Sequence, residues 1–188
     1  MMFNRLAIED VILVEPKRFG DHRGFFSETF HVSRFAEAGI EGPFVQDNHS
    51  LSAEVGTLRG LHFQIAPSPQ GKLVRCTAGR ILDVAVDIRT GSPTFGQHVS
   101  AELSADNGHQ LWVPAGFAHG FITLEPDTEV QYKVTGYYDP NADKGLAWDD
   151  PALGIDWPLP PSGAVLSAKD QEHPQLADLP DYFAYGKS

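Results

Sequence analysis

The sequence predicts a mainly β domain built as an antiparallel sandwich or barrel. Segments with strand character recur about every 8–12 residues and are separated by turns rich in glycine and proline. A single short segment has convincing helical character, so the alternation of strands and helices typical of a parallel sheet is missing. The 188 residues suffice for one domain, 1–188, with a sizeable core.

The N-terminal part is expected to contain two strands and one short helix. In chain order these elements are a strand at 10–16, a turn at 19–24, a strand at 25–30 and a helix at 33–38. Ser33 is the expected N-cap of the helix, and Gly39 follows its end.

The central part is expected to supply the remaining strands. They fall at 44–50, 57–64, 71–76, 80–89, 97–103, 110–114, 115–123 and 129–138. Apolar residues alternate with Asp83, Ala85 and Asp87, which predicts a half-buried strand. The amide-rich segment 44–50 suits recognition of a sugar or base, and it equally suits an exposed sheet edge.

The composition of the C-terminal part is typical of an ordered loop. From residue 139 it is rich in proline but also carries Trp148 and Trp157, so we expect it to wrap around the sheets. The core should extend over about 8–170, followed by a docked tail at 171–188.

The composition excludes several classes of partner. A formal charge of −11 argues against nucleic acid and anionic membranes. The N-terminus lacks an apolar segment of signal-peptide length, and no run approaches the roughly 20 apolar residues of a membrane span. The single cysteine, Cys76, fits a reducing compartment. We therefore expect a soluble, cytoplasmic protein.

Basic side chains gather on two neighbouring strands of the central part. Regular strand geometry places His62 on the face of Leu58 and turns Arg59 to the opposite face. A bulge at Gly60 would bring Arg59 back to the side of His62. Lys72 lies on the next strand. Because burying unpaired charge is costly, these side chains predict the floor of a site. The alternative is a strand pair with one solvated face.

A second motif points to a fold family. Gly108, Pro114, Gly116 and His119 have the spacing G-x5-P-x-G-x2-H, which resembles the second motif of the cupin superfamily. That resemblance implies a double-stranded jelly roll, here with short peripheral helices. Metal-binding cupins have H-x-H in their first motif, whereas this chain reads His62-Phe63-Gln64. A first-row metal would lack most of its ligands, so we expect no metal site.

Several segments in the same order resemble the dTDP-4-dehydrorhamnose 3,5-epimerase family. These segments are 59–64, 71–75, 83–89, 92–96, 113–121, 132–133 and 166–170. The similarity runs from about residue 8 to residue 170. It implies a metal-free cupin that uses no cofactor, acts on dTDP-4-dehydro-6-deoxy-D-glucose and forms a homodimer.

The resemblance also implies catalytic roles, and the chemistry agrees with them. Inverting a carbon beside a ketone requires a base, an acid on the opposite face and stabilisation of the enolate oxygen. His62 is the expected base, and Asp170 its carboxylate partner. Lys72 is placed to stabilise the enolate, and Tyr132 to return the proton. A core role with a satisfied hydroxyl is the alternative for Tyr132.

The same resemblance assigns substrate-binding roles. The residues concerned are Arg23, Glu28, Gln46, Asp47, Asn48, Arg59, His119, Tyr138, Asp143 and Lys169. Guanidinium groups suit phosphate oxygens, and Tyr138 corresponds to the ring that stacks on thymine. Asp143 departs from the family, in which many members have Glu, and the shorter side chain puts a direct ligand contact in question.

Three alternatives stay open from the sequence. The first is an epimerase that inverts C3 alone in another dTDP-deoxysugar pathway. The second is a metal-dependent cupin enzyme that uses His62 and His119. The third is a cupin that binds a sugar or nucleotide without catalysis.

Overall fold

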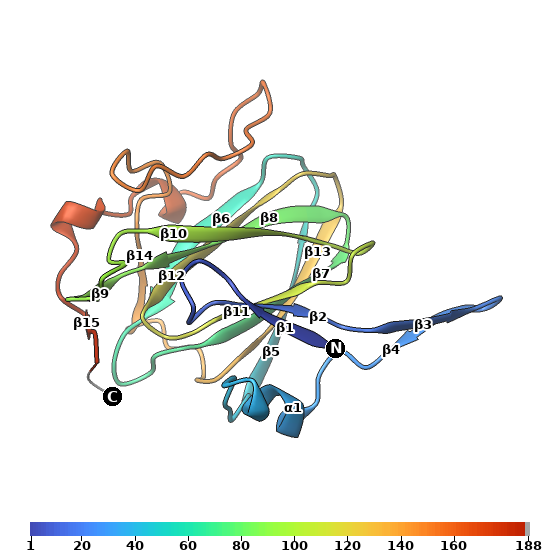
Figure 1. Ribbon diagram of the computed structural model, residues 1–188. Helices are drawn as coiled ribbons and strands as arrows, with labels where there is room; N and C mark the ends of the chain where they lie inside the picture. The colour runs from blue at the N-terminus through green and yellow to red at the C-terminus, as the bar shows by residue number, and fades with distance from the viewer. Residues whose placement is uncertain (187–188) are drawn as a thin grey trace.

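Two antiparallel β-sheets form a double-stranded jelly roll in the computed structural model, which describes residues 1–186 (Figure 1). The six-stranded sheet contains, in spatial order, β1 (Met2–Arg5), β2 (Ile12–Glu15), β11 (Gln110–Val113), β7 (Lys72–Ala78), β13 (Thr128–Val134) and β5 (Gln46–Ser52). The five-stranded sheet contains β10 (His98–Ser104), β8 (Arg80–Asp87), β12 (Phe117–Thr123), β6 (Leu58–Gln64) and β14 (Asp143–Gly145). The mainly β fold expected from the sequence is confirmed.

Shorter elements lie around the two sheets. They are the hairpin β3 (Arg18–Asp21) and β4 (Gly24–Ser27), helix α1 (Val32–Glu37), the 3₁₀ turns η1 (Lys169–Gln171) and η2 (Leu176–Asp178), and the parallel pair β9 (Arg89–Thr90) and β15 (Phe183–Ala184). The expected N-cap at Ser33 is wrong, because α1 begins one residue earlier with His31 at the N-cap position. No helix within residues 1–186 is long and apolar enough to cross a membrane. The last two residues of the expected tail lie outside the described residues.

The main core lies between the sheets. Val74 and Val130 of the six-stranded sheet belong to the same buried cluster as Ala85 and Phe121 of the five-stranded sheet. Tyr132 packs against this cluster and is only partly buried. Tyr132 therefore lies at the edge of the apolar core.

The C-terminal segment covers the outer face of the five-stranded sheet. Val84 and Val86 are fully buried there beneath a cluster that includes Leu146, Trp157 and Phe183. The segment is orange and red in Figure 1. The expectation that this segment is ordered and packs on the sheets is confirmed for the five-stranded sheet. The half-buried strand expected at 80–89 is wrong, because this cover buries β8 on both faces.

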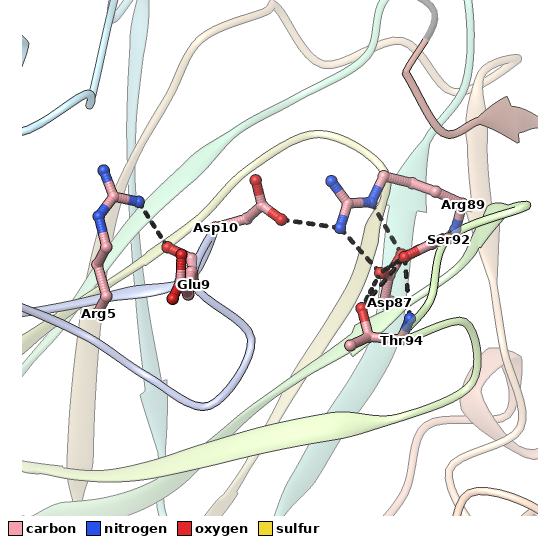
Figure 2. A network of polar contacts seen from close by, with 7 residues as sticks. All are labelled: Arg5, Glu9, Asp10, Asp87, Arg89, Ser92 and Thr94. Carbon is pink, nitrogen blue, oxygen red and sulfur yellow. Dashed lines mark hydrogen bonds and ion pairs between the residues drawn. The ribbon is translucent and has the colours of Figure 1, made fainter.

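A polar network ties the N-terminal loop to the end of β8 (Figure 2). Arg89 donates to Asp87 at 2.9 Å and 2.8 Å and reaches Asp10 at 2.9 Å. Ser92 and Thr94 each donate to Asp87 at 2.6 Å. Burial alone would raise the pKa of Asp87, but these donors outweigh it and lower that pKa. The buried carboxylate is thus ionised. It accepts the hydrogen bonds that fix Arg89, which in turn binds Asp10 of the N-terminal loop.

Strand β6 contains the irregularity that organises the site. His119 of β12 pairs with His62, while Phe121 pairs with Arg59, so β6 holds one residue more than β12 over this stretch. Gly60 takes a φ of 139° there, and a Cβ would lie 2.6 Å from the Cα of Gly120. The bulge expected at this glycine is confirmed.

The bulge changes which side chains share a face. Arg59 and His62 line one cavity, whereas Leu58 is buried in the cluster beneath the C-terminal segment. The expectation that Leu58 and His62 share a face is therefore wrong.

Candidate active site

Two adjoining cavities of about 170 Å³ and 230 Å³ open between the sheets. Both are lined by His62, Lys72, Tyr132 and Lys169. Strand β6 of one sheet supplies His62, and strands β7 and β13 of the other supply Lys72 and Tyr132. The site is thus assembled from both walls of the sandwich.

His62 is paired with a buried carboxylate. Its Nε2 lies 2.5 Å from Oδ1 of Asp170, whose side chain is 5% exposed. Burial lowers the pKa of His62 and outweighs the opposing effect of Asp170. Burial works against ionisation of Asp170, but its contacts with His173 and His62 lower the pKa of this carboxyl group. An ionised Asp170 accepts the hydrogen on Nε2, so the lone pair of His62 lies on Nδ1.

A second histidine–carboxylate pair lies beside the first. Nε2 of His119 is 2.7 Å from Oδ1 of Asp83, and both side chains are buried. His119 is the cross-strand partner of His62 and lines the larger of the two cavities. The other oxygen of Asp83 is buried and has no hydrogen-bond partner within residues 1–186. This pair places a fixed imidazole next to the proposed reaction centre.

Lys72 presents an ammonium group to the same space. Its Nζ donates to the backbone carbonyl of His62 at 3.1 Å. Burial lowers the pKa of Lys72 to about 8, against the opposing influence of Asp143 and Asp83. The side chain is therefore mainly protonated and charged at neutral pH, and it loses its proton at mildly alkaline pH.

Tyr132 reaches the cavity from the opposite sheet. Burial raises the pKa of its hydroxyl, so the group keeps its proton at neutral pH. It can therefore serve as a proton donor from the side of the cavity that faces β6.

Polar side chains around the mouth are held by mutual contacts. Arg59 donates to Oγ of Ser52 at 3.2 Å. Asp143 forms an ion pair with Lys169 and accepts a bond from the hydroxyl of Tyr138 at 3.3 Å. Of the ten residues given binding roles by the sequence, those that line the two cavities are Gln46, Asn48, Arg59, His119, Tyr138, Asp143 and Lys169.

Residues 5–178 match the family described as dTDP-4-dehydrorhamnose 3,5-epimerase. The chain belongs to this family. A relative of that name from Sinorhizobium fredii is 57% identical over 100% of this chain and 95% of its own length. Another, from Pseudomonas aeruginosa, is 54% identical over 95% of this chain and 97% of its own length.

A solved structure agrees in fold as well as in sequence. The dTDP-6-deoxy-D-glucose-3,5-epimerase from Legionella pneumophila, in complex with dTDP-4-keto-L-rhamnose, superposes with a TM-score of 0.94. The two chains are 45% identical, and the match covers 99% of each. A less similar relative from Streptomyces niveus is named dTDP-4-dehydrorhamnose 3-epimerase; it is 37% identical over 96% of this chain and 86% of its own.

Three of the ten residues with expected binding roles lie away from the cavities, and Arg23 and Glu28 are two of them. Arg23 lies in the β3–β4 turn with a side chain that is 78% exposed, and it pairs with Asp21. Glu28 pairs with Arg34. Within one copy of the described chain, these side chains are not brought to the site.

Asp47 is turned away for a simple geometric reason. It alternates with Gln46 and Asn48 along β5, so its side chain points to the other face of the sheet. There it forms an ion pair with Lys133 at 2.9 Å and lines a separate cavity of about 390 Å³. The alternation of side chains along a strand could have been applied to the sequence, and it would have predicted that Asp47 points away from Gln46 and Asn48.

Other cavity residues were missed by sequence reasoning. The lining also includes Ser50, Gln64, Gln70, Phe121 and Ser167. His173 was missed as well, although its Nε2 lies 3.6 Å from Oδ1 of Asp170. Its only signal was a histidine three residues after Asp170 in a segment without periodicity.

Proposed function

We propose that the chain is an isomerase that inverts C3 and C5 of dTDP-4-dehydro-6-deoxy-α-D-glucose. The product is dTDP-4-dehydro-β-L-rhamnose, and the reaction uses neither metal nor cofactor. The observation that carries this proposal is the placement of His62 and Tyr132 on opposite walls of one cavity, with Lys72 beside them. Family membership supports the choice of substrate.

Each inversion needs one deprotonation and one reprotonation. Nδ1 of His62 removes the proton from the carbon beside the ketone, and the electron pair of the broken C–H bond moves to the ketone oxygen. The Lys72 ammonium stabilises this enolate oxygen. The hydroxyl of Tyr132 then gives its proton to the other face of the carbon. Before the second cycle the His62 imidazolium releases its proton to solvent, and the Tyr132 phenolate takes up a proton from solvent.

The nucleotide part of the substrate is expected at the mouth of the site. Arg59 and Lys169 supply donors for the diphosphate, and His119 lines the same cavity. Tyr138 is 57% exposed and offers a flat face for stacking on the thymine ring. The ion pair of Asp143 with Lys169 gives Asp143 a positioning role in place of a direct ligand contact.

A homodimer would account for Arg23 and Glu28. The β3–β4 hairpin projects away from the two sheets (Figure 1). It carries Phe19, Phe25 and Phe26, which are 55%, 60% and 71% exposed. Exposed aromatic rings on one projecting element are typical of an interaction surface. We infer that the hairpin packs on a second copy of the chain and brings Arg23 to the substrate site of that copy.

The remaining partner and location expectations follow from composition. A charge of −11 disfavours nucleic acid and anionic membranes, while the free, buried Cys76 is compatible with a reducing cytoplasm. A cytoplasmic location also matches a soluble nucleotide-sugar substrate.

Incubation with the keto sugar in deuterated water tests the proposal. Proton NMR should show deuterium entering at C3 and at C5, together with inversion at both carbons. Exchange at C3 alone would identify the single-inversion alternative, which the Streptomyces niveus relative exemplifies by name. Tight dTDP binding without exchange at either carbon would identify a binding protein and overturn the proposed activity.

A further inference from the structure

His173 lies against the proposed base and its carboxylate partner. Its side chain is 9% exposed, and its Nε2 is 3.6 Å from Oδ1 of Asp170. That nitrogen has no hydrogen-bond partner within residues 1–186. The backbone beside His173 is held in place, because the carbonyl of Pro174 accepts a hydrogen bond from the amide of Ala147 at 2.8 Å. A buried, unpaired polar atom is unfavourable and calls for a reason.

A glycine in the sheet makes room for the His173 ring. Gly145 of β14 is the cross-strand partner of His62. A Cβ at Gly145 would lie 2.3 Å from both Cε1 and Nε2 of His173. Side chains of cross-strand partners point to the same face and are close neighbours. The His173 ring therefore occupies the place of the missing side chain, with its centroid 5.5 Å from that of His62 and the two rings 83° apart.

We propose that His173 is a positioning residue that directs its Nε2 hydrogen at the Asp170 carboxylate and so holds this carboxylate in place for His62. The proposal rests on the proposed role of His62 as the base. It explains the unpaired nitrogen, since the Asp170 oxygen that lies 3.6 Å from it also contacts His62.

Sharing one oxygen between two imidazoles has an electrostatic consequence. A donor from His173 stabilises ionised Asp170 and weakens the pull of Asp170 on the His62 proton. Burial has the largest effect and lowers the pKa of His62; Asp170 raises this pKa, and Lys72 and His173 lower it further. Removing His173 should therefore raise the pKa of His62 and make more of this base protonated at a given pH.

Other ionisable groups lie around His62. They are Lys72 of β7, Tyr132 of β13, His119 of β12 with Asp83 of β8, Asp143 of β14, Arg59 of β6, and Asp170 and Lys169 of η1. Each is unchanged in a variant at position 173, so a difference between such variants reports on His173.

Two substitutions separate a donor role from a packing role. His173→Met keeps the bulk and deletes the donor, while His173→Gln keeps an amide donor near the place of Nε2. We expect His173→Met to move the acid limb of the pH profile of kcat/KM upward by about half a pH unit or more. His173→Gln should restore the wild-type limb. The control is His98→Met, because His98 is half-buried on β10 and bonds the carbonyl of Leu153.

Some outcomes would overturn the proposal. These are a wild-type acid limb in His173→Met, the same shift in both variants, or a loss of rate that is equal at every pH. If His173→Met does not fold, nitrogen NMR of histidine-labelled wild-type protein gives the answer. Nε2 of His173 should carry a hydrogen, and its shift should respond to Asp170→Asn; an unprotonated Nε2 would refute the donor role.

The base assignment has its own test. Activity surviving in His62→Ala would remove the proposed role of His62, but it would leave the protonation of His173 seen by NMR unchanged. Failure of the two proposals can therefore be told apart.

Discussion

His62 on β6 and Tyr132 on β13 line the same cavity from opposite sheets of the sandwich. An inversion needs proton removal and proton return on opposite faces of one carbon. A sugar lying between the two sheets would present one face to each side chain. The proposed roles, His62 as the base and Tyr132 as the acid, therefore follow from the placement of β6 and β13 in opposite sheets.

Substitution of Tyr132 by Phe should separate exchange from inversion. Phenylalanine preserves the packing beside Val130 and Val134 and deletes the only proton that the side chain can give. In deuterated water, we expect the variant to exchange substrate hydrogen faster than it forms the inverted sugar. Wild-type protein should couple the two processes closely.

The result at Tyr132 can contradict the proposal in two ways. Inversion of both carbons at the normal rate would make Tyr132 a core residue and leave the acid to be sought elsewhere, for example in Tyr138. Equal loss of exchange and inversion would assign Tyr132 to deprotonation or positioning.

Removal of the His62 imidazole should abolish turnover while leaving the fold intact. Loss of a positioned base costs on the order of 10²–10⁴ in rate, and we expect His62→Ala to fall in this range. His98→Ala is the control, because His98 lies on β10 outside both cavities. Steady-state kinetics and circular dichroism measure the two properties. Activity above about a tenth of the wild-type value would refute the assignment.

The pH dependence of kcat/KM should be bell-shaped. His62 must be neutral to act as a base, and burial lowers its pKa, so the acid limb should lie below the ordinary value of about 6.5. Lys72 must be charged to stabilise the enolate, and its pKa of about 8 sets the alkaline limb. In Lys72→Arg the charge persists at higher pH, so the alkaline limb should move upward even if the maximum rate falls. An alkaline limb unchanged by this substitution would point to another group.

Metal removal should have no effect on turnover. Two imidazoles and a carboxylate are a plausible donor set for zinc, and within residues 1–186 the ligand atoms of His62, Asp170 and His173 lie within 4.8 Å of one another. We nevertheless expect full activity after exhaustive chelation and dialysis, because the proposed chemistry runs through protein groups alone. Activity that is lost on chelation and restored by added zinc would favour a metal-dependent enzyme, with a donor set that differs from the His62 and His119 considered from the sequence.

Local pattern was sufficient for much of the site. The basic side chains of Arg59, His62 and Lys72 on neighbouring strands predicted the cavity. Gly60 predicted the bulge that turns Arg59 toward this cavity. The burial of β8 on both faces could not be predicted from its alternation, because the cover comes from the C-terminal segment, which is distant from β8 in the chain.

The contribution of His173 was equally hidden from local reasoning. Its place depends on the missing side chain of Gly145, and a glycine at the end of a short strand reads equally well as part of a turn. Arg23 shows a different limit, since the role proposed for it requires a second copy of the chain.

The final prediction tests whether Arg23 acts across a subunit interface. Losing a guanidinium contact to a phosphate should raise KM for the dTDP-sugar about tenfold in Arg23→Ala, with a smaller change in kcat. His62→Ala should be inactive by itself. We expect dimers that combine one subunit of each kind, isolated with two different affinity tags, to recover about half of the wild-type kcat/KM.

The expected recovery follows from the arrangement of the two hairpins. If each hairpin serves the partner, one site of the mixed dimer joins an intact His62 to an intact Arg23, and the other site carries both defects. If each hairpin serves its own chain, every site carries one defect, so KM stays high and the rate stays low. Arg5→Ala is a matched control for Arg23→Ala, because Arg5 bonds the carbonyl of Glu9 in the N-terminal loop of its own chain. Mixed dimers no better than Arg23→Ala alone would place the action of Arg23 within one subunit and would remove the main support for the hairpin exchange.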